Sequence, residues 1–394
     1  MPSVGAPVFG KAFFNREREL NEILDSIGRD NILLVSPRRF GKSSLMRQVE
    51  IELGRNETPC LYFDVMDIKS PEKFIIEIAD ASFTKFGMSN RQKLIRALKT
   101  VFSAVDEISG STGGTELRVK LRGVVSDEIN RDNWANKGEE ILKAVIQVCE
   151  KRPVVFLIDE LSECVNNMIK EKADSVGFLQ WFRNIRQEMI DEVRFIVGGS
   201  ISFERVVKGI NGLSYINDFK HVIVEGFTKE VSLEFLKKCL AEEGIEYNKK
   251  IDEEILECIG EPYIPYFLAV FISILAQRPD KVLNVKIIEQ IYNNEVLGVY
   301  GKGYFEYYRQ RLRTYPEPIA IAAEEILRKV CLVDKGYPLG LAFSLFTRKS
   351  SINDFERFLD LIHDLENDFY IVVYNRKIFF RSKMLRDWWR LYYG

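Results

Sequence analysis

Residues 36–44 have the composition and spacing of a phosphate-binding loop, and read Ser36-Pro37-Arg38-Arg39-Phe40-Gly41-Lys42-Ser43-Ser44. They match the pattern GxxxxGK[ST] at every fixed position except the first, where Ser36 replaces glycine. In such a loop Gly41 permits a tight turn that points backbone N–H groups at phosphate oxygens, Lys42 reaches the β- and γ-phosphates, and the Ser43 hydroxyl ligates Mg2+. A short apolar run precedes the loop and a helical pattern begins near Ser43, whose dipole favours anions.

A second motif supports the first. The continuous apolar run 154–158 ends in Asp159-Glu160, the form of a Walker B strand. An Asp in this position can hold Mg2+, usually through water, and the adjacent Glu can polarise a water for attack on a γ-phosphate. The alternatives are a helix-start turn at Gly41–Ser43 and an ordinary helix cap at Asp159-Glu160. Together the motifs predict Mg-ATP binding, and hydrolysis if Glu160 acts as the base.

The elements around these motifs indicate an α/β fold. Four short apolar runs, at 31–35, 58–64, 153–158 and 193–197, read as buried strands separated by helical patterns. Continuously apolar strands are typical of a parallel sheet with helices on both faces, and we expect a P-loop NTPase sheet. Residues 109–123 differ, because Leu117, Val119 and Leu121 alternate with basic residues. This alternation predicts an amphipathic strand of a surface hairpin, either a partner-binding device or a solvated edge.

The strand signal stops near residue 226. Four helical patterns follow within 228–297, and further helices begin near 318. The chain then shows a short hairpin, 369–374 and 378–381, with a turn at Asn375-Arg376-Lys377. Helices followed by a short hairpin predict a winged helix. We therefore expect an ATPase domain at 1–225, an all-helical lid domain at 226–300 and a winged-helix domain at 301–394.

Four segments resemble the archaeal-type ATPases of the STAND/AAA+ group in matching order. They are Phe14-Asn15-Arg16-Glu17-Arg18-Glu19-Leu20, similar to an F-GRE-EL motif; residues 36–45, similar to GPRR-GK[TS]SL; Val197-Gly198-Gly199-Ser200; and Gly260-Glu261-Pro262, similar to a GxP motif. The resemblance runs from about residue 9 to the C-terminus. There are two departures from the family pattern, Asn15 and Ser36, which replace glycines with small or turn-competent residues.

The resemblance implies a site for ATP or ADP with Mg2+. The implied catalytic residues are Lys42, Asp159, Glu160 and the polar sensor Ser200, and the implied metal ligands are Ser43 and Asp159. Phe14 and Asn15 lie beside the adenine in this family, Pro37, Arg38, Arg39, Phe40, Gly41, Lys42, Ser43 and Ser44 form the loop, and Pro262 reads the nucleotide. Arg38 and Arg39 could instead contact a neighbouring domain or solvent. An arginine finger cannot be assigned, since Arg183, Arg186 and Arg205 are candidates by position only.

The function implied is a slow Mg-dependent ATPase or a molecular switch in which the C-terminal domain moves with the lid. The alternative is a non-hydrolysing, nucleotide-dependent DNA-binding regulator. The segment 381–394 mixes basic and aromatic residues, so the partner of the winged helix could be DNA or protein. The helical spacing of Met384, Leu385, Trp388, Trp389 and Leu391 favours docking into the domain core. The sequence predicts no oligomeric state.

Composition and net charge argue against several classes of protein. The formal net charge of −2 argues against a protein that coats nucleic acid uniformly. Six scattered cysteines without a CxxC pair predict neither a metal site nor a disulfide framework, and favour the cytoplasm. His221 and His363 are isolated, and we interpret both as structural. The longest apolar run, Phe267 to Ala276, is about half of what a bilayer requires, so no membrane association is expected.

Overall fold

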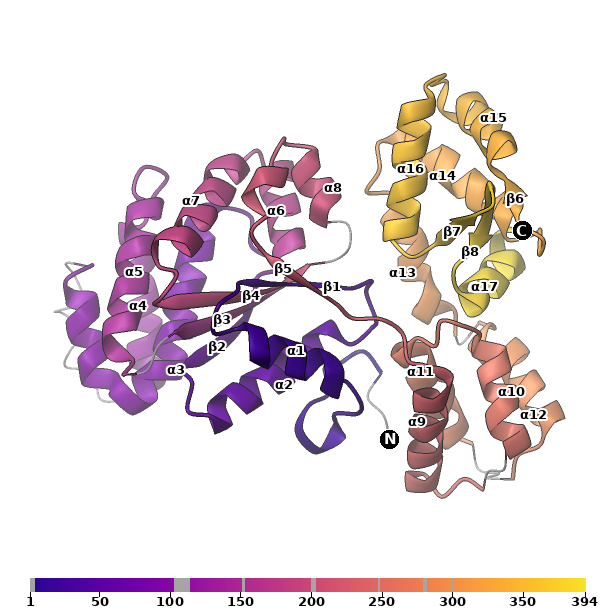
Figure 1. Cartoon of the computed structure of the whole chain (residues 1–394), viewed down its shortest axis with the longest axis horizontal. Coiled ribbons are helices and arrows are strands. Elements are labelled where there is room, and N and C mark those ends of the chain that lie inside the picture. The colour runs from indigo at the N-terminus through magenta and orange to yellow at the C-terminus, as the bar shows by residue number, and fades with distance from the viewer. Residues whose placement is uncertain are drawn as a thin grey trace. The chain divides into compact units, whose positions relative to one another are not determined.

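The computed structural model describes residues 4–102, 114–150, 153–199, 203–246, 249–278, 282–299 and 301–394. The chain divides into two compact units (Figure 1). The sheet unit comprises Val8–Ser36 and Lys42–Val224. The helical unit comprises Met1–Pro7, Pro37–Gly41 and Glu225–Gly394. Among the described helices, none combines the length and the apolar character that crossing a membrane demands.

A five-stranded parallel sheet forms the centre of the sheet unit. Its strands are β1 (Ile32–Val35), β2 (Cys60–Asp64), β3 (Val154–Asp159), β4 (Val193–Gly199) and β5 (Lys220–Ile223), in the order β2-β3-β4-β1-β5. Four of these strands coincide with the predicted apolar runs. The fifth, β5, was not predicted, because it lies at an edge and alternates exposed with more buried residues instead of forming a continuous apolar run.

Helices cover both faces of this sheet. They are α1 (Glu17–Ser26), α2 (Lys42–Arg55), α3 (Pro71–Lys99), α4 (Gly114–Glu128), α5 (Trp134–Val148), α6 (Leu161–Lys170), α7 (Ser175–Glu188) and α8 (Phe203–Lys208), with 3-10 turns at Gly10–Ala12 and Leu213–Tyr215. Strand residues alternate between two cores. In β3, Val155 and Leu157 pack with the core of α1 and α2, whereas Phe156 and Ile158 pack with that of α3, α5, α6 and α7. Because both faces are covered, every β3 residue is buried.

The predicted strand within 109–123 is wrong: residues 114–128 form helix α4, and 109–113 lie outside the described residues. The alternation of apolar and basic residues suggested a strand, but the same residues also place apolar side chains on one face of a helix. Leu121 and Val125, one turn apart, are buried, whereas Val119 is 67% exposed. On the same helix Arg118 and Arg122 both reach the buried carboxylate of Asp80 in α3, at 2.6 and 2.8 Å. Spacing of four residues, not two, therefore brings the side chains together.

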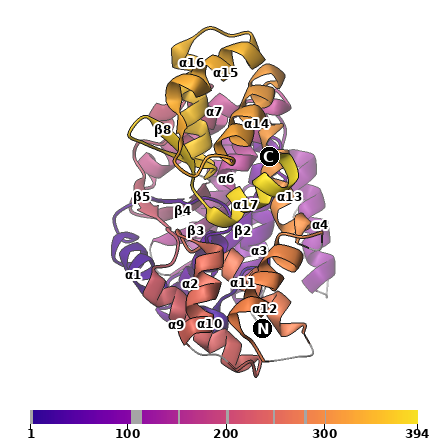
Figure 2. The same cartoon turned by 90° about the vertical axis from the view of Figure 1, so that its right-hand side faces the viewer.

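The helical unit begins with an all-helical stretch. It contains α9 (Lys229–Glu242), α10 (Lys249–Ile259), α11 (Pro265–Ala276), α12 (Val285–Ile291) and a π-helical turn, η4 (Tyr292–Val296). There follow α13 (Lys302–Leu312), α14 (Glu317–Val330), β6 (Tyr337–Pro338), α15 (Leu339–Ser350), α16 (Phe355–Asn367), β7 (Ile371–Tyr374), β8 (Lys377–Phe380) and α17 (Lys383–Tyr393). The three strands form an antiparallel sheet of order β6-β8-β7. Figures 1 and 2 show α9, α10 and α12 at one end of this unit and α15 and α16 at the other.

The aromatic residues near the C-terminus are part of a core. Trp388, Trp389, Met384 and Leu385 on α17 are fully buried, which confirms that their helical spacing marks a buried face. Leu391, grouped with them in the sequence analysis, is 57% exposed, so that assignment was wrong. The basic and aromatic C-terminal segment is therefore mainly a closing helix of its domain.

The helical character of α4 is testable with one pair of substitutions. We expect Leu121→Ala to destabilise the sheet unit by about 2–4 kcal/mol, because it leaves a cavity against α3. We expect Val119→Ala to change stability by less than about 0.5 kcal/mol, because that side chain is solvated. Denaturant titration of both variants measures the difference. In an amphipathic strand the two residues would share one face, so equal effects would contradict the helix.

Candidate functional site

The loop after β1 has backbone angles that only particular residues adopt easily. Gly41 has φ +94° and Arg39 has φ +76°. A residue with a Cβ is strained at such angles, which accounts for glycine at position 41. Lys42 then begins α2, so its side chain and those of Ser43 and Ser44 lie at a helix N-terminus. Lys42 is 7% exposed.

Asp159 and Glu160 stand at the carboxyl end of β3. Asp159 is 1% exposed, and its Oδ1 accepts the backbone N–H of Glu160 at 3.0 Å. Glu160 has φ +59° and caps α6, so the chain turns sharply there. Its Oε1 lies 3.6 Å from Lys42 Nζ, and its Oε2 is buried with no hydrogen-bond partner among the described residues. The structure thus brings the two sequence motifs together around Lys42.

These residues fit a nucleotide-bound Mg2+. Mg2+ in nucleotide sites takes one or two carboxylates, with phosphates and water completing the octahedron. Asp159 supplies a carboxylate and Ser43 a hydroxyl, and the unpartnered Oε2 of Glu160 is an acceptor available to a bound water. Within the described residues no group of three or more His, Cys, Asp or Glu is arranged to hold a metal. Asp159 and Ser43 therefore fit a cation that phosphate would also ligate.

Gly198 on β4 leaves the space in which these groups approach one another. A Cβ at position 198 would lie 2.5 Å from Asp159 Oδ1, 3.1 Å from Met46 Sδ and 3.2 Å from Lys42 Cε. Strand β4 separates β1 from β3, so any side chain here would push apart the two motifs that those strands carry. The resemblance had pointed to this segment for its sensor, Ser200. That residue lies outside the described part of the chain and remains a prediction.

Two residues of β2, Tyr62 and Asp64, were missed by the sequence analysis. The Tyr62 hydroxyl donates a hydrogen bond of 2.9 Å to Asp159 Oδ2, and Asp64 pairs with Asp159 in the strand register. Burial first, and then the charge and hydrogen bond of Asp159, raise the pKa of Tyr62 far above its usual value, so its hydroxyl remains a donor. Burial and, among nearby charges, Asp159 raise the pKa of Asp64. The available signal was that both residues lie in a predicted strand, which Asp64 ends.

The residues that precede the N-terminal motif run beside the start of α2. Ser44 Oγ accepts the backbone N–H of Val8 at 3.0 Å, and Gln48 Oε1 accepts that of Gly10 at 2.9 Å. Asn15 and Arg16, the second and third residues of the motif, have φ angles of 46° and 145°. Arg16 is buried and pairs with Glu19 at 2.8 Å. These contacts fix the backbone that follows Phe14, and the adenine-side role of Phe14 and Asn15 remains a prediction.

Ser36, which replaces the first glycine of the loop, has a structural role of its own. It is 1% exposed, and its hydroxyl donates a 3.1 Å hydrogen bond to the carbonyl of Val224. This bond joins the end of β1 to the residue that follows β5. The departure from glycine therefore strengthens the sheet edge beneath the loop.

Loop residues 37–41 belong by their packing to the helical unit. The guanidinium of Arg39 lies 4.1 Å from the centre of the Tyr266 ring, and that of Arg38 lies 5.3 Å from the Tyr307 ring. Phe40 is 2% exposed and meets Phe369 edge to face at 4.7 Å. All three loop side chains therefore contact aromatic residues. Their roles toward nucleotide, like that of Pro37, remain predictions.

The remaining predicted residues are placed as follows. Pro262 follows Gly260, which has φ +71°, and Phe227 and Tyr263 pair beside it. Arg186 is buried and bound to both carboxylate oxygens of Asp218, at 2.9 and 2.8 Å. Arg183 donates to the carbonyl of Ser214. The side chain of Arg205 lies outside the described residues, and His221 and His363 are exposed.

Removal of the Lys42 ammonium tests whether this site holds phosphate. A ligand at a hundred times its Kd stabilises a protein by about 2.7 kcal/mol, which raises the unfolding midpoint by several degrees. We expect Mg-ATP and Mg-ADP to raise the midpoint of the parent protein, and Lys42→Ala to lose the rise. Lys85→Ala is a matched control, because Lys85 pairs with Glu50 at 2.9 Å elsewhere in the same unit. A rise retained in Lys42→Ala would contradict the site.

Comparison with known proteins gives three findings. A family model described as "Predicted AAA-ATPase" matches residues 21–202. An uncharacterized ATP-binding protein of Methanocaldococcus jannaschii is 22% identical over 336 residues, covering 83% of this chain and 87% of that protein. A Walker-type ATPase of Pyrococcus abyssi superposes with a TM-score of 0.64 at 18% identity, covering 98% of this chain and 99% of the other.

A further structure shares the fold less closely. The ORC2 protein of Aeropyrum pernix, solved with ADPNP and ADP, superposes with a TM-score of 0.52 at 12% identity. The match covers 93% of this chain and 87% of the ORC2 chain. At such identities the structural likeness shows the fold alone. In sequence and in fold, the chain is thus similar to ATP-binding AAA-type P-loop ATPases.

Proposed function

We propose that this chain is a slow, Mg-dependent ATPase and molecular switch of the AAA+/STAND type, whose nucleotide state repositions a C-terminal winged helix. The observation that carries the proposal is the group formed by Lys42, Asp159 and Glu160. A buried carboxylate, a second carboxylate with one oxygen unpartnered among the described residues, and a buried ammonium converge at the carboxyl edge of a parallel sheet. Six free, buried cysteines support a reducing compartment such as the cytoplasm.

The ion pair between Lys42 and Glu160 is weak enough for phosphate to replace it. At 3.6 Å the pair is longer than a good charge-assisted hydrogen bond. Phosphate oxygens carry more charge than Glu160 and would attract the ammonium of Lys42 away from it. Glu160 would then be free to orient a water toward the γ-phosphate, with bound Mg2+ neutralising part of the phosphate charge. The same carboxylate can therefore pair with Lys42 or orient the attacking water.

The helical unit supports a lid and a winged helix. We assign α9–α12 and η4 to the lid, and residues 301–394 to the winged helix, whose elements follow the order α14, β6, α15, α16, β7, β8. The turn between β7 and β8 has two residues of positive φ, Asn375 and Arg376. Two such residues form a tight hairpin turn matched to the strand twist, and this turn is the tip of the proposed wing.

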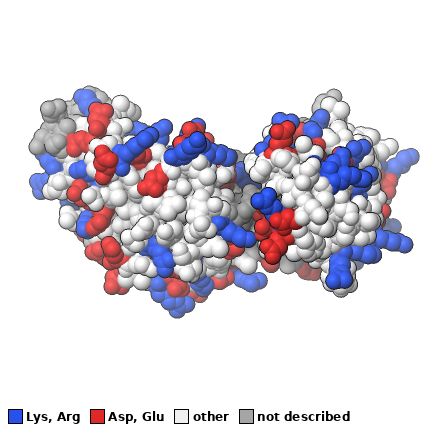
Figure 3. Space-filling model, turned by 90° about the horizontal axis from the view of Figure 1, so that it is seen from above, with Lys and Arg blue, Asp and Glu red and all other residues white. Residues whose placement is uncertain are grey.

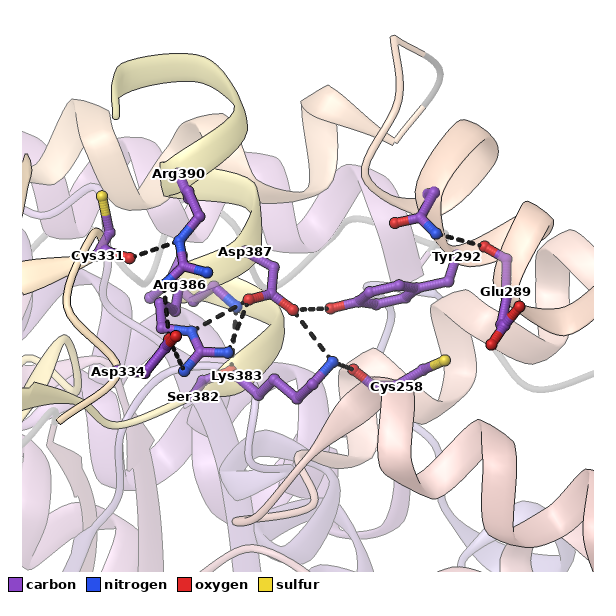
Figure 4. Close-up of polar contacts among 12 residues, drawn as sticks. Cys258, Glu289, Tyr292, Cys331, Asp334, Ser382, Lys383, Arg386, Asp387 and Arg390 are labelled. Atoms are coloured by element: carbon purple, nitrogen blue, oxygen red, sulfur yellow. Dashed lines mark hydrogen bonds and ion pairs between the residues drawn. The ribbon is translucent and has the colours of Figure 1, made fainter.

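A polar junction joins the lid to the last helix (Figure 4). The Tyr292 hydroxyl of η4 donates to Asp387 Oδ2 at 2.8 Å, and Lys383 Nζ pairs with the same oxygen at 3.1 Å. Lys383 also donates to the carbonyl of Cys258 in α10, at 3.4 Å. A Cβ on Gly260, the first residue of the GxP segment, would lie 2.5 Å from Lys383 Cβ. The lid segment that resembles a nucleotide reader is therefore in contact with α17, which supports movement of the two domains together.

Charge favours protein over DNA as the partner of the winged helix. Helix α16 carries Glu356, Asp360, Asp364 and Glu366 against one basic residue, Arg357. The last helix before the hairpin of a winged helix would repel phosphate with this charge. The face drawn in Figure 3 shows acidic and basic side chains intermingled on both units rather than one continuous basic surface. Salt-dependent binding of duplex DNA would overturn this preference and restore the DNA-binding alternative.

Turnover is tested at Glu160. We expect Glu160→Gln to lower the rate of ATP hydrolysis about 100-fold or more, because amide replaces the general base, while ATP remains bound. Phosphate release and equilibrium binding measure the two quantities. Glu171→Gln is the control, because Glu171 is an exposed carboxylate paired with Lys69. An unchanged rate in Glu160→Gln, or no turnover in the parent protein, would exclude the enzymatic part of the proposal.

The switch is tested at the junction. We expect backbone hydrogen exchange in α17 to differ between the ATP and ADP states of the parent protein, and Asp387→Ala to diminish the difference while both nucleotides still bind. Asp334→Ala is the matched control: Asp334 also pairs with α17, through Arg386 and Arg390, but makes none of the junction's bonds. If Asp387→Ala responds like the parent protein, the junction does not transmit the nucleotide state.

A further inference from the structure

We propose that Tyr62 is a positioning residue for the magnesium-binding carboxylate, and that it ties Asp159 to the helix that carries Ser43. The inference rests on the proposed function and concerns a residue outside both nucleotide-binding motifs. Tyr62 stands on β2, the strand hydrogen-bonded to β3, and is half-buried. It does not lie in the phosphate-binding loop, so it would act through Asp159 and not on the nucleotide.

Tyr62 and the backbone of Glu160 together fix the orientation of the Asp159 carboxylate. The Tyr62 hydroxyl donates to Oδ2 at 2.9 Å, and the Glu160 N–H donates to Oδ1 at 3.0 Å. A carboxylate has about four acceptor positions, so two remain after these bonds. Because each oxygen has one donor, rotation of the carboxyl group is restrained, and the remaining lone pairs keep a fixed direction. Restraint of this kind is how neighbouring groups tune metal ligands.

The ring of Tyr62 connects this carboxylate to the loop helix. The guanidinium of Arg47 lies 3.5 Å from the ring centre, within the range of a cation–π contact. Arg47 is four residues after Ser43 on α2, so the two side chains share a face of the helix, one turn apart. Arg47 is itself held by Glu50 at 3.0 Å. Tyr62 thus contacts Asp159 through its hydroxyl and α2 through its ring.

This arrangement links the positions of the two proposed metal ligands. Ser43 moves with α2, and Asp159 moves with β3, and Mg2+ requires near-ideal octahedral geometry at short distances. A side chain that contacts both elements reduces their independent motion and therefore the cost of assembling the coordination sphere. A merely space-filling tyrosine would stabilise the fold equally with and without Mg2+. The two roles consequently differ in one observable, the Mg2+ dependence of nucleotide binding.

The test substitutes Tyr62 by Phe, which removes the hydroxyl and keeps the ring over Arg47. ADP is bound at a series of Mg2+ concentrations, with the unfolding midpoint and calorimetric binding as readouts. We expect Tyr62→Phe to raise the Mg2+ concentration at half-saturation about tenfold, as for loss of one charge-assisted hydrogen bond, with ADP binding in EDTA unchanged. In an Asp159→Asn background, Tyr62→Phe should add no further shift, because the effect passes through Asp159.

Tyr393→Phe is the matched control. Tyr393 donates a hydrogen bond of the same kind, 3.1 Å long, to Glu306 in the helical unit. It should leave the Mg2+ dependence as in the parent protein. If the parent protein shows Mg2+-dependent binding and Tyr62→Phe has the same Mg2+ midpoint, or loses affinity equally in EDTA, the positioning role is overturned. If the parent protein itself binds ADP without any Mg2+ dependence, the proposed Mg-dependent function fails, and this inference fails with it.

Discussion

The burial of one negative charge, that of Asp159, organises the sheet unit. A carboxylate that is 1% exposed must be hydrogen-bonded or paired, because an isolated buried charge is very costly. Neighbours in two parts of the fold meet this requirement: Tyr62 on β2 and the backbone of Glu160 at the start of α6. The strand order determines which elements can contribute, since β2 is adjacent to β3.

Strand β4 lies between β1 and β3, and this explains why position 198 on β4 must have no side chain. Lys42 and Asp159 come from strands that are not neighbours, and Gly198 on the strand between them has no side chain to separate them. Any other residue would place a carbon 2.5 Å from Asp159 Oδ1. Gly41 and Glu160, which are the sequence neighbours of Lys42 and Asp159, both have positive φ angles. Backbone angles of this kind persist when surrounding contacts hold them, and they are frequent at ligand-binding sites.

The sequence was sufficient for the parts of the fold that rest on continuous apolar runs or on fixed motifs. The positions of strands β1 to β4 follow from apolar runs in the sequence. The proximity of Lys42 and Glu160 follows from the two nucleotide-binding motifs that contain them. Strand β5 was missed because its exposed residues interrupt the apolar pattern. Helix α4 was misread as a strand because Leu117, Val119 and Leu121 alternate with basic residues. The helical spacing is explained by Asp80, which is far away in sequence and pairs with two arginines four residues apart. Tyr62 was missed for the same reason: its importance comes from a strand neighbour and not from its own surroundings.

Charge counted along the chain likewise misleads about the helical unit. Residues 300–394 have more basic than acidic residues, which alone suggests attraction to an anion. Many of the basic groups, however, are held by acids within the unit, including Arg311 with Asp368 at 2.7 Å, Arg309 with Glu324 at 2.8 Å and Arg390 with Asp334 at 2.7 Å. A guanidinium engaged in this way would have to give up an ion pair to bind phosphate. The paired arginines therefore stabilise the domain's own packing. Helix α16 is acidic, which is the physical reason to look for a protein partner.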